Sequence, residues 1–342
     1  RDLHSFPTRR SSDLFVNTIR DQWVGLAVDK ALAPQKFPSV RKKMRLEHSD
    51  FCPFCEGNED ATPPEVFAMR AGGGESNGIN WDLRLIPSKF TTFHSDEEFI
   101  SSDQGINQSY NGFGRHEVLV ETPDHDLEMA DYDIKRLLNI LNIWKRRYNQ
   151  LASDRRFKYI QIYKNSGFLA GASIDHGHSQ IIAYPFIPNN HAGVYKYHRV
   201  HKRCLLCDMI FQEIEQAVRI LYDNADFLLL MPYAPRFPYE TWLVPHRHSQ
   251  HFGFISASEV QSLARLLRGF LRTLRLVLDN PAFNILIHTA PINTANQEMF
   301  HWFIEITPRM LIASGVEIVS GVYMNPVAPE IAAGILRQKL EF

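Results

Sequence analysis

The residues best suited to chemistry in this chain lie in the segment His176-Gly177-His178-Ser179-Gln180. On an extended backbone alternate residues share a face, so two imidazoles and a carboxamide line up on one side. A neutral imidazole is nucleophilic near pH 7, and the phosphoramidate that it forms is reactive enough to pass the group on. Gln180 can donate a hydrogen bond to a non-bridging phosphoryl oxygen as charge develops there. We therefore predict that His178 attacks a phosphorus centre, with Gln180 beside it.

A lone His-x-His at the start of a strand is more often a pair of surface histidines. Here, however, a stretch of small residues precedes the pair, from Gly167 through Gly171-Ala172-Ser173. Small residues let backbone N–H groups come close to a phosphate, which favours the chemical interpretation. A metal ion bound to His176 would in addition hold the strand and set the position of His178.

The four cysteines form two Cys-x-x-Cys pairs, and none is left over. In a chain of 342 residues whose first residues do not read as a secretory signal, this favours metal or redox chemistry over disulfides. A cytoplasmic location follows as the default. Two intervening residues let Cys52 and Cys55 reach one tetrahedral ion, and His125 and His176 are placed to complete a zinc site. A free thiol pair or a redox motif is the alternative.

A second zinc site is predicted with less support from the sequence. Its candidate ligands are Cys204, Cys207, His248 and His301. His246 and His251 compete with His248 for the third position. Two buried thiols without an ion are the alternative here, because free cysteine is a common core residue.

The elements that must position these residues are predicted from apolar patterning. Strands are expected over 116–121, 159–164, 180–184, 227–231, 241–244, 283–287 and 302–306. Helices are expected over roughly 131–152, 208–222 and 257–279, the last with Ser256 and Ser258 as candidate caps.

The order of these parts repeats along the chain. A Cys-x-x-Cys pair, a strand, a long helix, a strand and a histidine-led strand occur twice, and the segments His178 to Pro185 and His301 to Pro308 have the same spacing. In this alignment His301 is the counterpart of His178, and Phe303 stands where Gln180 is. The fold class predicted is α+β: a duplicated unit whose strands join one mixed, mostly antiparallel sheet with helices packed on it.

The two halves are expected to cover 15–186 and 187–342, with a boundary near 186–203. Residues 1–14 read as a non-native leader and are left out of the fold. Composition is ordinary, with 44% apolar residues, 22% charged residues and a formal net charge of −1. No basic excess indicates a nucleic acid partner, and no apolar run reaches the length of a membrane span.

These motifs together resemble the galactose-1-phosphate uridylyltransferase family, the transferase branch of the histidine-triad superfamily. The resemblance covers nearly everything after residue 15, and its most specific pieces are Cys52-Pro53-Phe54-Cys55-Glu56-Gly57-Asn58, Tyr163-Lys164-Asn165, Gly171-Ala172-Ser173, the His-x-His segment itself, the run Met231 to Trp242, and Tyr323-Met324-Asn325-Pro326.

The resemblance implies roles for individual residues. The structural zinc would be held by Cys52, Cys55, His125 and His176, and a second, variable metal site by Cys204, Cys207, His248 and His301. The nucleophile would be His178, with Gln180 on its phosphoryl group, while Asn165 and Ser173 would touch the nucleotide phosphates. The implied partners are a nucleotide sugar and a sugar phosphate, in a ping-pong exchange, and relatives form dimers.

Two departures from the family pattern bear on substrate identity. Where the family commonly has Arg-x-x-Arg-Pro, this chain reads Asp29-Lys30-Ala31-Leu32-Ala33-Pro34, so Lys30 is the remaining candidate to bind phosphate. Lysine is a point charge and lacks the bidentate fork of arginine. The region near Gly315-Val316-Glu317 also lacks a lysine that some members use at the hexose.

The leading hypothesis is a hexose-1-phosphate uridylyltransferase that exchanges UDP-glucose and galactose 1-phosphate. A phosphorylase of ADP-glucose or of a dinucleoside polyphosphate would use the same histidine. A catalytically idle zinc-dependent nucleotide-binding module is disfavoured because His178 and Gln180 are both present. A nucleic-acid-binding zinc protein is disfavoured by the neutral net charge.

Overall fold

The computed structural model describes residues 13–26, 34, 51–91, 93–95, 98–189, 191–295 and 297–341. Lys30, the candidate phosphate ligand, lies outside the described residues. The expected leader overlaps the first strand, since β1 (Asp13–Asn17) begins at Asp13 and pairs with β2 (Gln22–Leu26).

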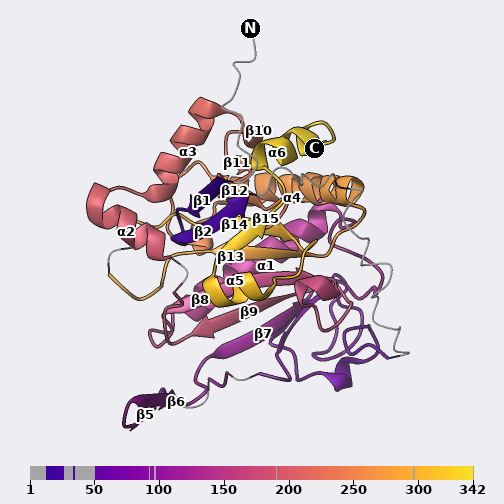
Figure 1. The fold of residues 1–342 in the computed structure, drawn as a ribbon. Coiled ribbons are helices and arrows are strands. Elements are labelled where there is room, and N and C mark those ends of the chain that lie inside the picture. The colour runs from indigo at the N-terminus through magenta and orange to yellow at the C-terminus, as the bar shows by residue number, and fades with distance from the viewer. Residues whose placement is uncertain are drawn as a thin grey trace.

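A ten-stranded sheet runs through the whole molecule (Figure 1). Every neighbouring pair of strands in it is antiparallel. In spatial order the strands are β10 (Ile220–Asp223), β11 (Phe227–Leu230), β12 (Thr241–Pro245), β14 (Phe303–Pro308), β13 (Phe283–His288), β8 (Tyr159–Ser166), β9 (His178–Tyr184), β7 (Arg115–Val120), β4 (Leu83–Pro87) and β3 (Phe67–Met69). All seven strands predicted from the sequence belong to this sheet.

The duplication is visible in the strand order. The first half places its strands as β3-β4-β7-β9-β8, and the second half places its own as β10-β11-β12-β14-β13. Strand β8 is the fourth large-sheet strand of the first half along the chain, and β13 is the fourth of the second half. These two strands lie side by side at the centre of the sheet and join the halves. The fold is therefore a duplicated histidine-triad-like α+β unit, as expected. The mixed character lies in a separate small sheet, where β15 (Tyr323–Asn325) runs parallel to β2.

Two long helices cover one face of the large sheet and pack on each other. Helix α1 (Ile134–Ala152) begins after Asp133, whose side chain accepts from the Arg136 backbone N–H. Helix α4 (Ala257–Leu278) begins with a capping box between Ser256 and Glu259. Of the two serines predicted as caps, Ser256 is the N-cap residue.

One helix prediction was wrong at its end. Helix α3 (Leu205–Gln216) stops at Ala217, which adopts a left-handed conformation with φ 54°. The residues predicted to continue the helix to 222 instead enter strand β10, because Ile220 and Tyr222 pair with β11 at the edge of the sheet.

The opposite face of the large sheet carries the small sheet and shorter elements (Figure 1). On this face lie α2 (Ala192–His201), α5 (Gly315–Ser320) and the 3-10 turns η4 (Glu59–Ala61) and η5 (Phe168–Ala170). On the helix face, α6 (Pro329–Arg337) packs on α4 and the 3-10 turn η6 (Phe252–Phe254) packs on α1. The hairpin of β5 (Ser101–Gln104) and β6 (Asn107–Tyr110) projects from the molecule (Figure 1). None of the described helices combines the length and the apolar character that crossing a membrane requires.

Candidate active site and metal centres

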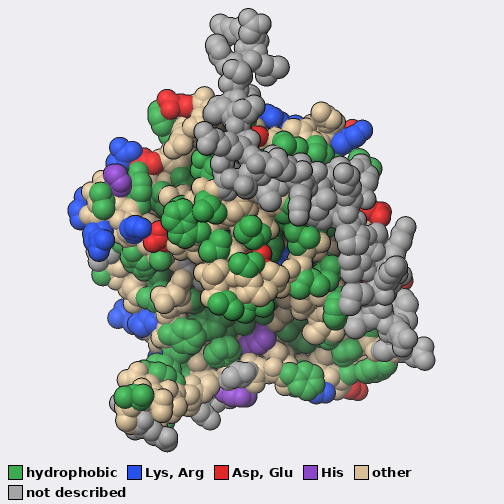
Figure 2. Space-filling model, viewed as in Figure 1, with side chains coloured by type: hydrophobic (Ala, Val, Ile, Leu, Met, Phe, Trp, Pro, Cys, Tyr) green, Lys and Arg blue, Asp and Glu red, His purple; other side chains and the backbone are tan. Residues whose placement is uncertain are grey.

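The side chains of His178 and Gln180 project from the face of the sheet that the long helices leave open. Between them in the chain, Ser179 points to the helices, since its hydroxyl accepts from the indole N–H of Trp144 on α1 at 2.9 Å. Alternate residues of a strand point to opposite faces, so the two candidate catalytic side chains share the other face, as predicted. In Figure 2 a histidine side chain reaches the surface in a hollow below α5, over β7 and β9.

No side chain fits between the two histidines unless its neighbours shift. A Cβ atom added to Gly177 would lie 2.2 Å from the hydroxyl of Tyr132, which is closer than any real contact. The Gly177 carbonyl also accepts from the backbone N–H of Glu121 at 2.9 Å. The close approach fixes the start of β9 against the loop that follows β7.

The imidazole of His178 has the features that a neutral nucleophile requires. Its Nδ1–H donates to the carbonyl oxygen of His176 at 2.7 Å, which leaves the lone pair on Nε2 for attack. The side chain is only 4% exposed. Burial, together with the nearby Lys164 ammonium, lowers the pKa of His178 to about 4. The ring is therefore uncharged at neutral pH without help from a general base.

A buried ion pair lies beside the backbone of His178, and sequence reasoning missed it. The Lys164 ammonium donates to Glu121 Oε2 at 2.7 Å and to the carbonyl oxygen of His178 at 3.0 Å. The Tyr132 hydroxyl donates to the same Glu121 oxygen at 3.3 Å. The one signal available in the sequence was a lysine inside an otherwise buried strand, since such a residue needs a partner.

Gln180 is held by donors from the strands on both sides. Its Oε1 accepts from the Tyr163 hydroxyl on β8 at 2.8 Å and contacts His116 Nε2 on β7, also at 2.8 Å. Its amide nitrogen has no protein partner among the described residues. Neither Tyr163 nor His116 was singled out from the sequence as a site residue, because their contacts depend on strand register.

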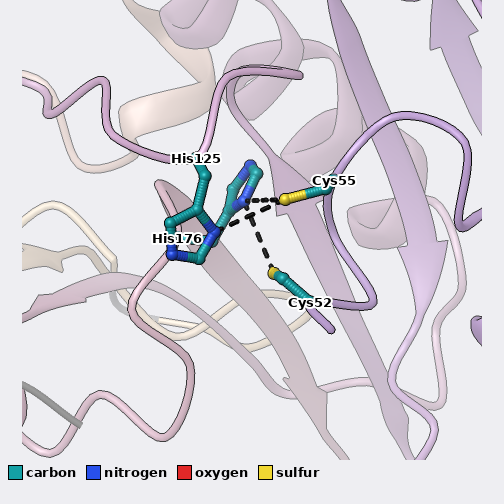
Figure 3. Close-up of side chains that lie close together, drawn as sticks. All are labelled: Cys52, Cys55, His125 and His176. Atoms are coloured by element: carbon teal, nitrogen blue, oxygen red, sulfur yellow. Dashed lines mark hydrogen bonds between the residues drawn. The ribbon is translucent and has the colours of Figure 1, made fainter. Parts of the chain in front are cut away.

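The first predicted metal quartet is brought together by the fold (Figure 3). The ligand atoms of Cys52, Cys55, His125 and His176 all lie within 4.8 Å of one another. His176 bonds the carbonyl oxygen of Thr122 through Nε2 at 2.7 Å, which turns its Nδ1 towards the two sulfurs at 3.6 and 3.7 Å. This donor set of two thiols and two imidazoles fits a tetrahedral zinc ion.

The first Cys/His quartet also lies against His178. The Phe54 ring, between the two cysteines, packs edge-on against the rings of His178 and His176, at centroid distances of 5.3 and 6.1 Å. Burial and the adjacent Cys52 raise the pKa of the Cys55 thiol to about 12. Two thiols packed this closely favour a cation that accepts both as thiolates.

The second predicted quartet is also assembled. Cys204, Cys207, His248 and His301 place their ligand atoms within 4.8 Å of one another. The Cys207 sulfur lies 3.2 Å from His248 Nδ1 and 3.5 Å from His301 Nδ1. Of the competitors, His246 bonds Asp223 and His251 bonds Gln297, so His248 is the residue that joins the cluster. This donor set too fits a tetrahedral ion.

The expected alignment of the two halves was wrong by two residues. His301 bonds the carbonyl oxygen of Pro245 through Nε2 at 2.8 Å and turns Nδ1 to the cysteine. His176 does the same with Thr122, so His301 corresponds to His176 and not to His178. The nucleophile position in the second half is therefore Phe303, and the glutamine position is Glu305.

Glu305 is engaged in a buried ion network. Its carboxylate accepts from Arg20 at 2.7 Å, from Arg236 at 2.6 Å and from His288 at 2.9 Å. Burial opposes ionisation, but the two arginines hold the pKa of Glu305 well below its usual range. The second half thus carries a buried ion network at the position where the first half carries Gln180.

The two residues predicted to touch nucleotide phosphates lie near the loop after β8. The Asn165 amide donates to the carbonyl of Gly171 at 3.3 Å and accepts from Asn284 at 2.8 Å, so it fastens this loop to β13. Gly167 and Gly171, with φ of 82° and 83°, allow the tight turn of η5. Ser173 is exposed in the same loop.

The fold and the site together define a duplicated histidine-triad-like protein in which the first half carries the His-x-His-x-Gln segment. Comparisons with known proteins agree with this class. Residues 84–188 match the family model described as galactose-1-phosphate uridyl transferase, N-terminal domain. The chain is 31% identical to ADP-glucose phosphorylase of Arabidopsis thaliana over 337 residues, covering 96% of this chain and 93% of the relative. It is 26% identical to galactose-1-phosphate uridylyltransferase of Thermotoga maritima over 339 residues, covering 95% and 98%.

Solved structures give the same picture. A crystal structure of ADP-glucose phosphorylase from Arabidopsis thaliana with bound ADP-glucose matches with a TM-score of 0.77 and 29% identity, over 96% of this chain and 99% of that one. A uridylyltransferase structure shares the fold with a TM-score of 0.73 at 21% identity, over 95% and 97%. The chain belongs to the galactose-1-phosphate uridylyltransferase family and is an enzyme of the nucleotidyltransferase type.

Proposed function

We propose that this enzyme transfers a nucleotidyl group from a nucleotide sugar through a covalent intermediate on Nε2 of His178. The observation that carries the proposal is the hydrogen bond from His178 Nδ1–H to the His176 carbonyl oxygen. This bond leaves the lone pair on Nε2 of an uncharged ring available for attack. In the first step Nε2 attacks the α-phosphorus, a P–N bond forms, and the bond to the β-phosphate oxygen breaks. The sugar 1-phosphate leaves with that electron pair.

In the second step an acceptor phosphate oxygen attacks the same phosphorus and the P–N bond breaks. Both leaving groups are good ones, so the protein contributes mainly alignment and charge stabilisation. Gln180 would donate to a non-bridging oxygen in both steps. The Lys164–Glu121 pair holds the carbonyl of His178 and so fixes the strand that carries the nucleophile.

We favour ADP-glucose as donor and inorganic phosphate as acceptor, giving ADP and glucose 1-phosphate. The support is the higher identity to the ADP-glucose phosphorylase, 31% against 26% for the uridylyltransferase, at similar coverage. Exchange of UDP-glucose and galactose 1-phosphate, the leading hypothesis from the sequence, is the second candidate, because the chain's family contains both activities among its relatives. Asn165, Ser173 and Lys30 remain proposed phosphate contacts.

Zinc is proposed at both Cys/His quartets. All four positions of each would be filled by protein, so the ions would be structural and would supply rigidity to the loops around β9 and β14. A cytoplasmic location, where paired thiols stay reduced, is part of this proposal.

The test is a labelling experiment with ADP-glucose and UDP-glucose carrying 32P at the α-phosphate. We expect acid-labile label on the wild-type protein and on a His246→Gly control, and none on His178→Gly. Labelled enzyme is then chased with phosphate or with galactose 1-phosphate. Faster release by phosphate, as labelled ADP, supports the phosphorylase; release only by galactose 1-phosphate supports the uridylyltransferase. Absence of label from both nucleotide sugars contradicts the covalent mechanism.

A further inference from the structure

The amide oxygen of Gln180 is enclosed by two donors that belong to different strands. Tyr163 is the direct cross-strand neighbour of Gln180 on β8, and His116 lies diagonally from it on β7. Each reaches Oε1 at 2.8 Å. A carboxamide has one acceptor end and one donor end, so occupying the oxygen in this way turns the NH2 group to the open side.

Both groups are suited to act as donors at neutral pH. Burial raises the pKa of the Tyr163 hydroxyl to about 12, so it keeps its proton. Burial lowers the pKa of His116, so the ring is neutral and donates through a single nitrogen. Both side chains are half-buried, which limits competition from water for the amide oxygen.

The second half of the molecule supplies an internal comparison. There Glu305 stands at the glutamine position, and its direct cross-strand neighbour is Leu286, which has no hydroxyl. Glu305 is held by Arg20 and Arg236 instead. The tyrosine donor is therefore found in the half that keeps the nucleophile and is missing in the half that lost it.

We propose that Tyr163 and His116 are positioning residues that orient the Gln180 amide so that its NH2 group faces one non-bridging oxygen of the phosphoryl group on His178. This inference rests on the proposed function. Without the two donors the amide can rotate and turn its oxygen towards the phosphoryl group. The negatively charged phosphoryl oxygens repel the amide oxygen. The two donors therefore strengthen the hydrogen bond from the Gln180 NH2 group to the one non-bridging oxygen that this group faces.

The experiment measures single-turnover labelling of His178 with the two α-phosphorothioate diastereomers of ADP-glucose. Sulfur is a poor hydrogen-bond acceptor, so the wild-type enzyme should prefer one diastereomer, and Gln180→Ala should lose that preference. Tyr163→Phe and His116→Leu should each slow labelling by roughly threefold to tenfold, the value of one neutral hydrogen bond. More decisively, each should bring the ratio of the two rates towards that of Gln180→Ala.

The matched control is Tyr184→Phe, which removes a half-buried tyrosine hydroxyl from β9 without touching Gln180. Its ratio should stay at the wild-type value. If Tyr163→Phe and His116→Leu slow both diastereomers equally, their role is only structural and the inference is overturned. The inference is also overturned if the wild-type enzyme and Gln180→Ala show the same ratio of labelling rates for the two diastereomers. Absence of label on the wild-type protein would overturn the proposed function and this inference together, whereas labelling with an unchanged ratio overturns this inference alone.

Discussion

The Nδ1–H of His178 donates to the carbonyl oxygen of His176 at 2.7 Å, so the proposed nucleophile is oriented by the backbone of a proposed metal ligand. His176 and His178 flank Gly177 in the sequence, and the rings of both contact Phe54 of the Cys-x-x-Cys loop. The structural and chemical parts of the site are thus adjacent but distinct.

Cys55→Ser and His178→Gly should have opposite effects on zinc and on chemistry. Cys55→Ser removes a ligand, so zinc content should fall by about one ion per chain and the thermal midpoint should drop, because metal loss is among the large destabilising changes. His178→Gly should keep its zinc and its fold but lose labelling. Atomic absorption, thermal unfolding and labelling check this. If the two variants lost zinc to the same degree, the division of roles would be wrong.

The buried Lys164–Glu121 pair should behave as a unit. Lys164→Met removes the cation that Glu121 pairs with at a fully buried position and leaves only the Tyr132 hydroxyl on that carboxylate oxygen, which should cost about 3–5 kcal/mol of unfolding free energy. The double variant Lys164→Met, Glu121→Leu removes both charges and should recover most of that loss. Denaturant unfolding of the two single variants and the double variant gives the coupling free energy. Additive losses would show that the two side chains do not form a pair.

The free energy of unfolding should fall as pH is lowered below about 6.5. His191 should account for one of the protons taken up on unfolding in this range. This side chain is buried against Phe300 and His288, and burial, with the neighbouring His288, lowers its pKa to about 3. The unfolded state binds the proton more readily, so stability is complete above the unfolded pKa. It decreases by up to about 1.4 kcal/mol per pH unit between roughly 6.5 and 3.

The variant His191→Phe should flatten the pH dependence of unfolding by about one proton between pH 6.5 and 5. Tyr159, which lies 3.4 Å from His191 Nε2, is also hydrogen-bonded to the backbone of Thr289 and so keeps a partner. Tyr195→Phe, which removes a hydroxyl from a ring that also packs on Phe300 and keeps its proton over this pH range, serves as the control and should leave the slope unchanged. An unchanged slope in His191→Phe would mean that the buried imidazole is protonated in the folded state.

The sequence was sufficient to predict what depends on spacing. The two metal quartets follow from pairs of cysteines with histidines at repeated offsets, and both clusters form as predicted. The seven strands follow from apolar patterning because each is buried on at least one face. The repeat register failed because it rested on the equal spacing of His178 to Pro185 and His301 to Pro308, whereas the contacts of His301 match those of His176.

What the sequence did not predict depends on which strands lie side by side. Glu121 and Lys164 are 43 residues apart, and His116 and Gln180 are 64 apart. Each pair meets only once β7, β9 and β8 are placed in register. A polar residue in a buried strand signals that it needs a partner, but local patterning carries no information about which one.

The last prediction concerns the glycine of the His-x-His segment. Gly177→Ala would place a methyl group 2.2 Å from the Tyr132 hydroxyl and 3.3 Å from a Thr122 methyl. The start of β9 must then shift, so the variant should lose about 1–3 kcal/mol of unfolding free energy and should label more slowly. Tyr132→Phe removes the clashing oxygen. The double variant Gly177→Ala, Tyr132→Phe should therefore regain part of both the stability and the labelling rate lost in Gly177→Ala, measured against Tyr132→Phe alone. If the second substitution rescues neither property, the requirement for glycine comes from the backbone of residue 177 and not from its contact with Tyr132.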